Sequence, residues 1–246
     1  MTAALRIAGL KKAFGGLPAT NDVSLEVMPG ERRLIIGPNG AGKTTLFNLV
    51  TGSLKPDQGR IELFGQEVTR LRQDQRASLG MARTYQIITL FGKERLEHNI
   101  VLSLLGLSPL RWGGFRPLSA YPELYAEARR ALGQVGLEHL AHRLVGEVSY
   151  GERRRVEIAM ALAQKPRLLL LDEPLAGLPR EERAAVKALI NAIPREVTVV
   201  MIEHDMDTAL DMAERITLLH YGMVIVEGSR AEVVADPRTR EVYLGN

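Results

Sequence analysis

The chain has 246 residues, of which 46% are hydrophobic and 25% are charged, values that are typical of a globular protein. This length suits one interrupted fold as well as two small domains. The absence of cysteine excludes disulfides and thiolate metal sites. A net charge of +3 permits a nucleic-acid partner without implying one. The longest apolar runs, such as residues 168–171, are far shorter than the roughly 20 residues of a membrane-spanning helix. The first residues lack a basic segment followed by an apolar stretch, so we expect no secretion signal.

Two strands of an antiparallel piece are predicted near the start. Apolar and polar residues alternate over 5–10 and 23–27, and the connection contains Gly15, Gly16 and Pro18. Phe14 lies in that connection. An aromatic ring at this place either stacks on a nucleobase or packs under a loop, and the spacing alone favours packing.

A phosphate-binding pattern occupies residues 37–45, because Gly-Pro-Asn-Gly-Ala-Gly-Lys-Thr-Thr matches G-x-x-x-x-G-K-[ST]. The apolar run 33–36 predicts a buried strand before it, and residues 45–51 have helical spacing that stops at Gly52. This order of strand, loop and helix predicts that the chain binds a nucleoside triphosphate. The candidate ATP-binding residues are Gly37, Pro38, Asn39, Gly40, Ala41, Gly42, Lys43, Thr44 and Thr45.

The chemistry of this loop explains the pattern. Its glycines let successive backbone N–H groups turn inward at a helix N-terminus, where the partial positive charge favours an anion. Lys43 adds a full charge for the terminal phosphates, and the hydroxyl of Thr44 is the expected Mg²⁺ ligand.

The middle of the chain begins with a strand and then becomes helical. Strands are predicted at 59–64 and 81–85, with a helix-like segment at 69–79 between them. Gln86 ends the second strand, where it either reaches a metal-bound water or satisfies a turn, and its position favours the turn. From residue 87 to residue 166 the helical spacing predicts a subdomain inserted into an α/β core.

Within this helical part, residues 103–122 are rich in glycine, proline and aromatics, including Trp112 and Phe115. We expect a loop or a broken segment that either binds a partner or packs locally, and local packing is the default.

A second candidate anion site begins at Ser149, where residues 149–152 predict a capping box that starts a helix. Capping alone explains the spacing; the functional alternative is that the Ser149 hydroxyl and glycine N–H groups bind an anion at the helix N-terminus. The three arginines at 153–155 point around the helix, so we expect them to be solvated.

Two carboxylates follow a buried strand predicted at 168–171, at the edge of the sheet where open α/β folds place ligands. Asp172 is expected to hold Mg²⁺ directly or through water, and Glu173 to polarise the attacking water. A helix at 180–193 and a strand at 197–202 come next, and His204 after that strand is a candidate contact for the γ-phosphate. The chain is expected to close with a hairpin at 215–219 and 223–227 and a short helix at 243–245.

Together, these motifs resemble the complete set found in ABC-type ATPase subunits. The motifs are residues 37–45, Gln86, residues 149–152, residues 168–173 and His204. The resemblance implies an α/β fold: a P-loop NTPase core with an antiparallel β piece and an inserted α-helical subdomain. It divides the chain, as one ABC ATPase domain, into a core of residues 1–86 and 165–246 and a helical subdomain of residues 87–164.

The same resemblance assigns roles and partners. It implies ATP and Mg²⁺ as cofactors, with Thr44, Gln86 and Asp172 at the metal, Glu173, His204 and Gln86 as catalytic residues, and Phe14 stacked on the base. Two such subunits, identical or homologous, pair head to tail, and Ser149, Tyr150, Gly151 and Glu152 of one contact the ATP held by the other. The resemblance also implies integral membrane permease subunits, a solute-binding protein, a place on the cytoplasmic face of the inner membrane, and no nucleic acid.

A finer resemblance is to the ATPases of branched-chain amino acid importers. It rests on residues 83–86, 90–91, 149–151, 176–178, 202–206 and 243–245. The ATPases of lipopolysaccharide export and of urea import are similar too, and a soluble ABC ATPase acting on nucleic acid is a further alternative. Three residues depart from the family pattern: Tyr150 and Glu152 replace the usual Gly and Gln, and Pro179 replaces an Asp.

Overall fold

The computed structural model describes residues 2–112, 117–204 and 209–244. The chain divides into two compact units, one formed by residues 1–83, 167–174 and 193–246 and the other by residues 84–166 and 175–192. None of the helices in the described part of the chain has both the length and the apolar composition needed to cross a bilayer.

The first unit contains an antiparallel sheet whose described strands have the order β2-β1-β4-β5. These strands are β1 (Leu5–Phe14), β2 (Leu17–Val27), β4 (Gln58–Leu63) and β5 (Gln66–Glu67). Buried and exposed residues alternate along β1 and β2 because only one face of the sheet is covered. The first two strands are longer than predicted, so Phe14 is the last residue of β1 and not part of the connection.

The second sheet of this unit is mostly parallel and has the order β10-β9-β3-β8-β7-β6 among the described strands. They are β3 (Arg32–Ile36), β6 (Met81–Arg83), β7 (Leu168–Asp172), β8 (Thr198–Ile202), β9 (Arg215–His220) and β10 (Met223–Ser229). Only β9 and β10 pair antiparallel, as the predicted hairpin. Every residue of β3, β7 and β8 is buried, as expected of strands that are covered on both faces.

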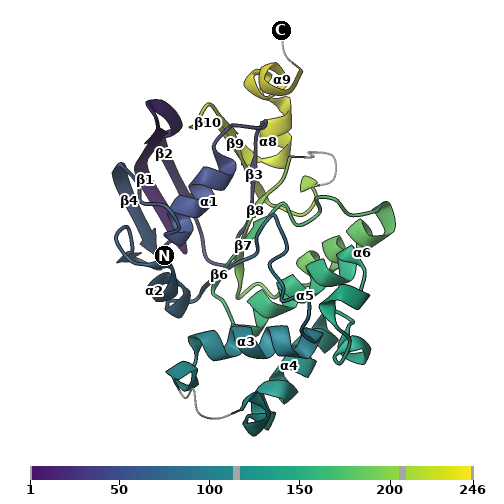
Figure 1. Cartoon of the computed structure of the whole chain (residues 1–246). Coiled ribbons are helices and arrows are strands. Elements are labelled where there is room, and N and C mark those ends of the chain that lie inside the picture. Colours follow the sequence, from purple (N-terminus) through teal and green to yellow (C-terminus); the bar gives the residue numbers. More distant parts are fainter. Residues whose placement is uncertain (1, 113–116, 205–208, 245–246) are drawn as a thin grey trace. The chain divides into compact units, whose positions relative to one another are not determined.

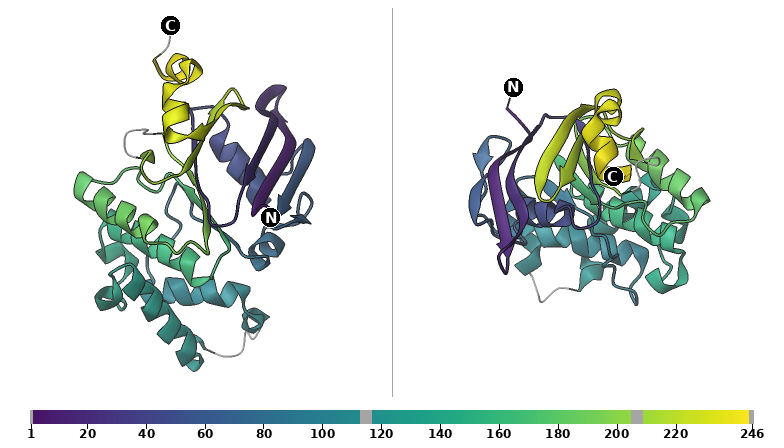
Figure 2. Two further views of the ribbon diagram at one scale, coloured as in Figure 1. Left: turned by 180° about the vertical axis from the view of Figure 1, so that it is seen from behind. Right: turned by 90° about the horizontal axis from the view of Figure 1, so that it is seen from above.

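Helix α1 (Lys43–Thr51) lies between these two sheets (Figures 1 and 2). Its residues Leu46, Phe47, Leu49 and Val50 join one buried cluster with apolar side chains of both sheets. The helix ends where the sequence predicts, because Gly52 adopts a left-handed φ of 81° and donates its N–H to the carbonyl of Leu49. This packing fixes the N-terminus of α1, and with it the phosphate loop.

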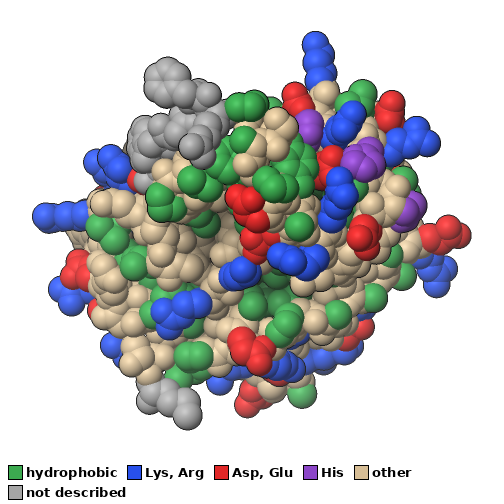
Figure 3. All heavy atoms as spheres, turned by 90° about the horizontal axis from the view of Figure 1, so that it is seen from below, with side chains coloured by type: hydrophobic (Ala, Val, Ile, Leu, Met, Phe, Trp, Pro, Cys, Tyr) green, Lys and Arg blue, Asp and Glu red, His purple; other side chains and the backbone are tan. Residues whose placement is uncertain are grey.

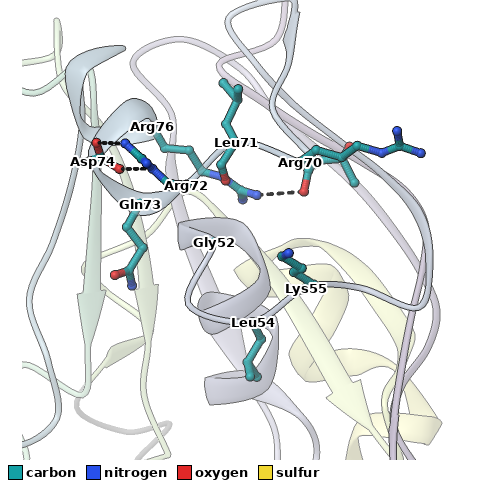
Figure 4. Close-up of a pocket in the computed structure, with 10 residues that line it drawn as sticks. Gly52, Leu54, Lys55, Arg70, Leu71, Arg72, Gln73, Asp74 and Arg76 are labelled. Carbon is teal, nitrogen blue, oxygen red and sulfur yellow. Dashed lines mark hydrogen bonds and ion pairs between the residues drawn. The ribbon is translucent and has the colours of Figure 1, made fainter.

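Helix α2 (Gln73–Ser78) is shorter than the predicted segment 69–79. The hydroxyl of Thr69 bonds the backbone of Ile61 on β4, which holds the start of that segment out of the helix. Arg76 of α2 is buried and donates to backbone carbonyls at the end of α1 and in the connection before α2, beside a pocket of about 400 Å³ (Figure 4). Burial lowers the pKa of Arg76 to about 10.

The first unit ends in α8 (Arg230–Ala235) and α9 (Pro237–Leu244), so the final helix begins earlier than predicted.

The second unit is helical. It consists of α3 (Leu96–Leu107), α4 (Pro122–Gln134), α5 (Tyr150–Ala163) and α6 (Arg180–Asn191), with short 3-10 turns at Pro109–Trp112, Leu118–Ala120, Glu138–Leu140 and Val145–Glu147. Apolar side chains of α3, α4 and α5 form its buried core, and Leu189 of α6 packs against that core. The sequence-based division placed α6 in the core unit; the structure groups it with the helices because it packs on α5.

The predicted loop at 103–122 is partly helical, since α3 continues to Leu107 before the 3-10 turns. The expectation for the side chains of Trp112 and Phe115 lies outside the described residues.

Candidate nucleotide-binding site

The phosphate loop joins the end of β3 to the start of α1. Gly37, Gly40 and Gly42 all have positive φ, at 154°, 81° and 99°. A Cβ at Gly37 would collide with the carbonyl oxygen of Leu219, and one at Gly42 with that of Ala19. Backbone from β9 and β2 therefore closes on the loop from outside, and glycine is required at these two positions.

Lys43 is buried inside this loop. Its ammonium group donates to the carbonyls of Gly37 and Pro38, at 2.6 and 3.0 Å. Burial lowers the pKa of Lys43, and the nearby carboxylates of Glu173, Asp172 and Glu203 oppose that shift. A triphosphate at this helix N-terminus would add negative charge beside the ammonium, so the loop, the helix and Lys43 all favour the same kind of ligand.

The two carboxylates at the end of β7 face different partners. Asp172 is buried, and its Oδ2 accepts a bond from the guanidinium of Arg83 at 2.6 Å. Glu173 has left the strand with a φ of 46°, and its N–H donates to the carbonyl of Ile202 on β8. Its side chain retains 12% exposure and turns toward His204. A buried carboxylate and a solvent-accessible one therefore stand side by side at the carboxyl edge of the parallel sheet.

His204 follows β8 at that same edge, and its side chain is 53% exposed. Its Nδ1 lies 3.8 Å from Oε2 of Glu173 and 3.9 Å from Oε2 of Glu203. Both contacts become ion pairs only when the imidazole is protonated. The structure thus brings His204, Glu173, Asp172 and Lys43 together within the first unit.

Phe14 lies at the tip of the hairpin formed by β1 and β2, where it pairs with Leu17. Phe14 is 48% exposed and its ring centroid lies 5.7 Å from Nζ of Lys12, so no loop among the described residues covers it as the packing alternative requires. Ala19, whose carbonyl closes on Gly42, is two residues beyond Leu17 on β2, a separation of about 7 Å in a strand. The hairpin tip therefore lies near the phosphate loop.

The chain leaves the sheet at Arg83, two residues before the predicted end of the strand. The N–H of Tyr85 donates to the carboxylate of Glu157 instead of extending the ladder. Gln86 is exposed in the second unit, and its carbonyl and that of Tyr85 accept bonds from Arg154 at 3.2 and 2.7 Å. Gln86 therefore does not end a strand, and its main chain is held by helix α5.

Arg154 corrects the expectation that residues 153–155 are solvated. Its side chain is fully buried and pairs with Glu157 at 2.6 Å. The flanking residues Arg153 and Arg155 are partly exposed and donate to backbone carbonyls. Arg154 is buried because its guanidinium satisfies the carbonyls of Tyr85 and Gln86, which lie outside any strand or helix.

Arg83 is a site residue that sequence reasoning missed. Besides Asp172, its guanidinium bonds Oδ1 of Asn48 at 2.6 Å and lies over the ring of Phe47, with 5.6 Å between the carbon and the centroid. It links α1 to the carboxylate at the end of β7. An arginine directly after two apolar strand residues was the only signal in the sequence.

We expect Arg83→Gln to lower the free energy of unfolding by about 3 kcal/mol, because removing one partner of a buried ion pair leaves the other charge buried. Denaturant unfolding measures this change. Arg60→Gln is the matched control, since Arg60 makes only exposed ion pairs with Glu62 and Glu67, which are worth about 1 kcal/mol at most. Equal losses in the two variants would show that the buried ion pair with Asp172 contributes no more to the free energy of unfolding than the exposed ion pairs of Arg60.

The capping box at Ser149 is confirmed. The Ser149 side chain accepts from the N–H of Glu152 at 3.2 Å, and the Ser149 N–H donates to Oε2 of Glu152 at 2.7 Å. The neighbouring Tyr150 is exposed, whereas Gly151 is buried. The carboxylate of Glu182, from α6, already contacts this helix N-terminus, and no local pattern predicts this contact.

The donor set fits a magnesium ion held largely by phosphate. Thr44 and Asp172 offer oxygen ligands, and the described residues contain no group of three or more His, Cys, Asp or Glu side chains able to hold a metal alone. A glycine loop at a helix N-terminus, a buried lysine and paired carboxylates at the end of β7, which β8 separates from β3 in the same parallel sheet, define a P-loop ATPase.

Comparison with known proteins specifies the family. Residues 20–176 match the family model described as ABC transporter. The chain belongs to this family and is one of its ATP-binding, ATP-hydrolysing subunits.

Curated relatives cover nearly the whole chain. It is 36% identical to the high-affinity branched-chain amino acid transport ATP-binding protein BraF of Pseudomonas aeruginosa, over 98% of this chain and 97% of that protein. LivG of Escherichia coli, which has the same description, is 36% identical over 98% and 97%. The lipopolysaccharide export system ATP-binding protein LptB of Acidithiobacillus ferridurans is also 36% identical, over 100% and 98%.

Solved structures agree in fold. A crystal structure of an ATP-binding cassette of an ABC transporter in its ADP conformation superposes with a TM-score of 0.88 at 31% identity, covering 100% of both chains. A dimeric cassette in a post-hydrolysis state bound to ADP and phosphate gives a TM-score of 0.79 at 25% identity, over 92% of this chain and 98% of that one.

Proposed function

We propose that this chain powers the import of branched-chain amino acids as the ATPase subunit of an ABC transporter. The observation that carries the proposal is the similarity to BraF and LivG over 98% of the chain, which extends beyond the ATPase motifs. Residues 83–86 and the segment 103–122 also favour this type of importer. Lipopolysaccharide export is the second candidate, since LptB has the same identity.

The proposed function assigns a role to each candidate residue. The phosphate loop and Lys43 bind the triphosphate, and Phe14 stacks on the base. Thr44, Asp172 and Gln86 would hold Mg²⁺, which would supply positive charge to the phosphates. Glu173 accepts a proton from the attacking water, and His204 contacts the γ-phosphate.

We further propose a head-to-tail dimer in which residues 149–152 of one subunit contact the ATP of the other. ATP binding closes this dimer and hydrolysis opens it, which drives permease subunits on the cytoplasmic face of the inner membrane. A solute-binding protein supplies the cargo. On the face drawn in Figure 3, acidic and basic side chains are interspersed, so this face is not the basic patch typical of nucleic-acid binding.

Co-purification from detergent extracts tests the transport role. We expect the chain to carry integral membrane permease subunits with it, and the reconstituted complex to hydrolyse ATP faster with leucine and its binding protein than with either omitted. Stimulation by lipopolysaccharide instead would select the second candidate. Salt-dependent binding to RNA or DNA, with no membrane protein recovered, would contradict both.

Pro179 predicts weak pairing of the isolated subunit. It is the N-cap of α6, with φ −58° and ψ 156°, and it has no N–H and no carboxylate to offer across a dimer. We expect the parent protein to sediment as a monomer at micromolar concentration with Mg-ATP, because dimer closure needs permeases that hold two copies at high effective concentration.

Restoring the family's carboxylate should strengthen the pairing. In a Glu173→Gln background, Pro179→Asp is expected to lower the dimer dissociation constant about 100-fold, because one charge-assisted hydrogen bond is worth about tenfold at each of the two sites of the dimer. Pro179→Ala is the control for loss of the ring. A parent that is already a stable dimer without partners would overturn this prediction.

A further inference from the structure

The N-terminus of α5 already holds an anion from the same chain. The Oε1 atom of Glu182, in the first turn of α6, accepts a hydrogen bond from the Ser149 hydroxyl at 2.7 Å. Its Oε2 atom accepts one from the N–H of Gly151 at 3.1 Å. No basic side chain of the described residues pairs with Glu182, so its charge is balanced by a hydroxyl, a backbone N–H and the ends of helices.

The surrounding residues are shaped to this carboxylate. The Ser149 hydroxyl accepts from the N–H of Glu152 and so has its own hydrogen left to donate to Glu182. A Cβ on Gly151 would collide with the carboxyl group of Glu182, so glycine here makes room for it. Ser149 and Gly151 therefore form a two-donor cradle, in which each oxygen of the Glu182 carboxylate accepts one hydrogen bond.

We propose that Glu182 is an internal competitor for the terminal phosphate of ATP at this cradle. The inference rests on the proposed dimer, in which the same Ser149 hydroxyl and Gly151 N–H contact the phosphate held by the other subunit. A carboxylate and a phosphate are both anionic acceptors, so they cannot use the same two donors together. Glu182 must therefore leave the cradle each time the dimer closes.

This competition sets how readily ATP closes the dimer. Hydrogen bonds to a charged acceptor are stronger than those to a neutral one by a factor of about five in equilibrium constant. Glu182→Gln keeps the shape of the side chain, but its single amide oxygen can accept only one of the two bonds and carries no full charge, so displacement becomes easier by at least that factor at each site. Closure displaces two copies of Glu182, and the effects multiply to at least about 25-fold in the dimerisation constant.

Sedimentation with Mg-ATP in the Glu173→Gln background tests the proposal. We expect Glu182→Gln to lower the dimer dissociation constant by at least about 25-fold. Glu181→Gln is the matched control: it removes the same charge from the adjacent, exposed position of α6 and is expected to change little. Glu182→Asp, which keeps the charge but shortens its reach, should also tighten the dimer. Equal constants for Glu182→Gln and Glu181→Gln would overturn the proposal, and a weaker dimer would show that Glu182 holds Ser149 in place instead.

A further variant separates this inference from the proposed function. Ser149→Ala should weaken the dimer in the same background, while ATP binding to the dilute monomer stays unchanged. If Ser149→Ala pairs like its parent, the trans phosphate contact itself is wrong. If Ser149→Ala weakens pairing but Glu182→Gln behaves like Glu181→Gln, the contact stands and only the competition fails.

Discussion

Lys43→Ala is expected to remove most ATP binding. The carbonyls of Gly37 and Pro38 hold the buried ammonium inside the phosphate loop. On the proposed role it would donate charge-assisted bonds to the terminal phosphates. Losing two such bonds, at about 1.5–3 kcal/mol each, lowers affinity by roughly 100-fold or more. Equilibrium binding of a fluorescent ATP analogue measures the loss.

Lys55→Ala is the matched control for this change. Lys55 is exposed in the same unit, after the end of α1, so its removal changes the net charge equally and leaves the loop intact. We expect this variant to bind ATP like the parent. Micromolar affinity retained by Lys43→Ala would refute the role of Lys43 in phosphate binding.

Glu173→Gln is expected to separate binding from hydrolysis. The side chain keeps its size beside His204, and Asp172 keeps its pair with Arg83, so ATP affinity should be unchanged. Loss of the base should slow hydrolysis by about 10²–10⁴-fold, and an ATP-bound dimer should accumulate. Phosphate release under saturating ATP and sedimentation with Mg-ATP measure the two effects.

Glu196→Gln controls for loss of a carboxylate, because Glu196 is exposed in the turn before β8. It is expected to hydrolyse at the parent rate. If Glu173→Gln does the same, Glu173 is not the base, and another group near the γ-phosphate must activate the water.

Local chemistry explains which features were predictable from sequence. The glycine loop, the capping box at Ser149 and the helix stop at Gly52 depend on residues within a few positions of each other, and the structure shows each backbone arrangement. The buried strands also followed from short apolar runs, because a strand covered on both faces has no polar side.

Buried charges were not predictable, because their partners are distant in sequence. Arg154 bonds carbonyls 68 and 69 residues earlier, and Arg83 pairs with a carboxylate 89 residues later. A local window shows only charged residues, whose usual place is the surface. Glu182 is the same case at 33 residues from Ser149, and the length of β1 depended on pairing with β2 and not on its own alternation.

The bonds from Arg154 to the main chain at Tyr85 and Gln86 have a mechanical consequence. Arg154 belongs to α5, the helix whose first turn carries Ser149 and Gly151. On the proposed roles, Gln86 senses the metal of its own subunit, whereas Ser149 reports on the nucleotide of the other. On these roles, a shift of α5 would move the main chain of Gln86 together with Ser149 and Gly151, and this one helix would couple the two nucleotides.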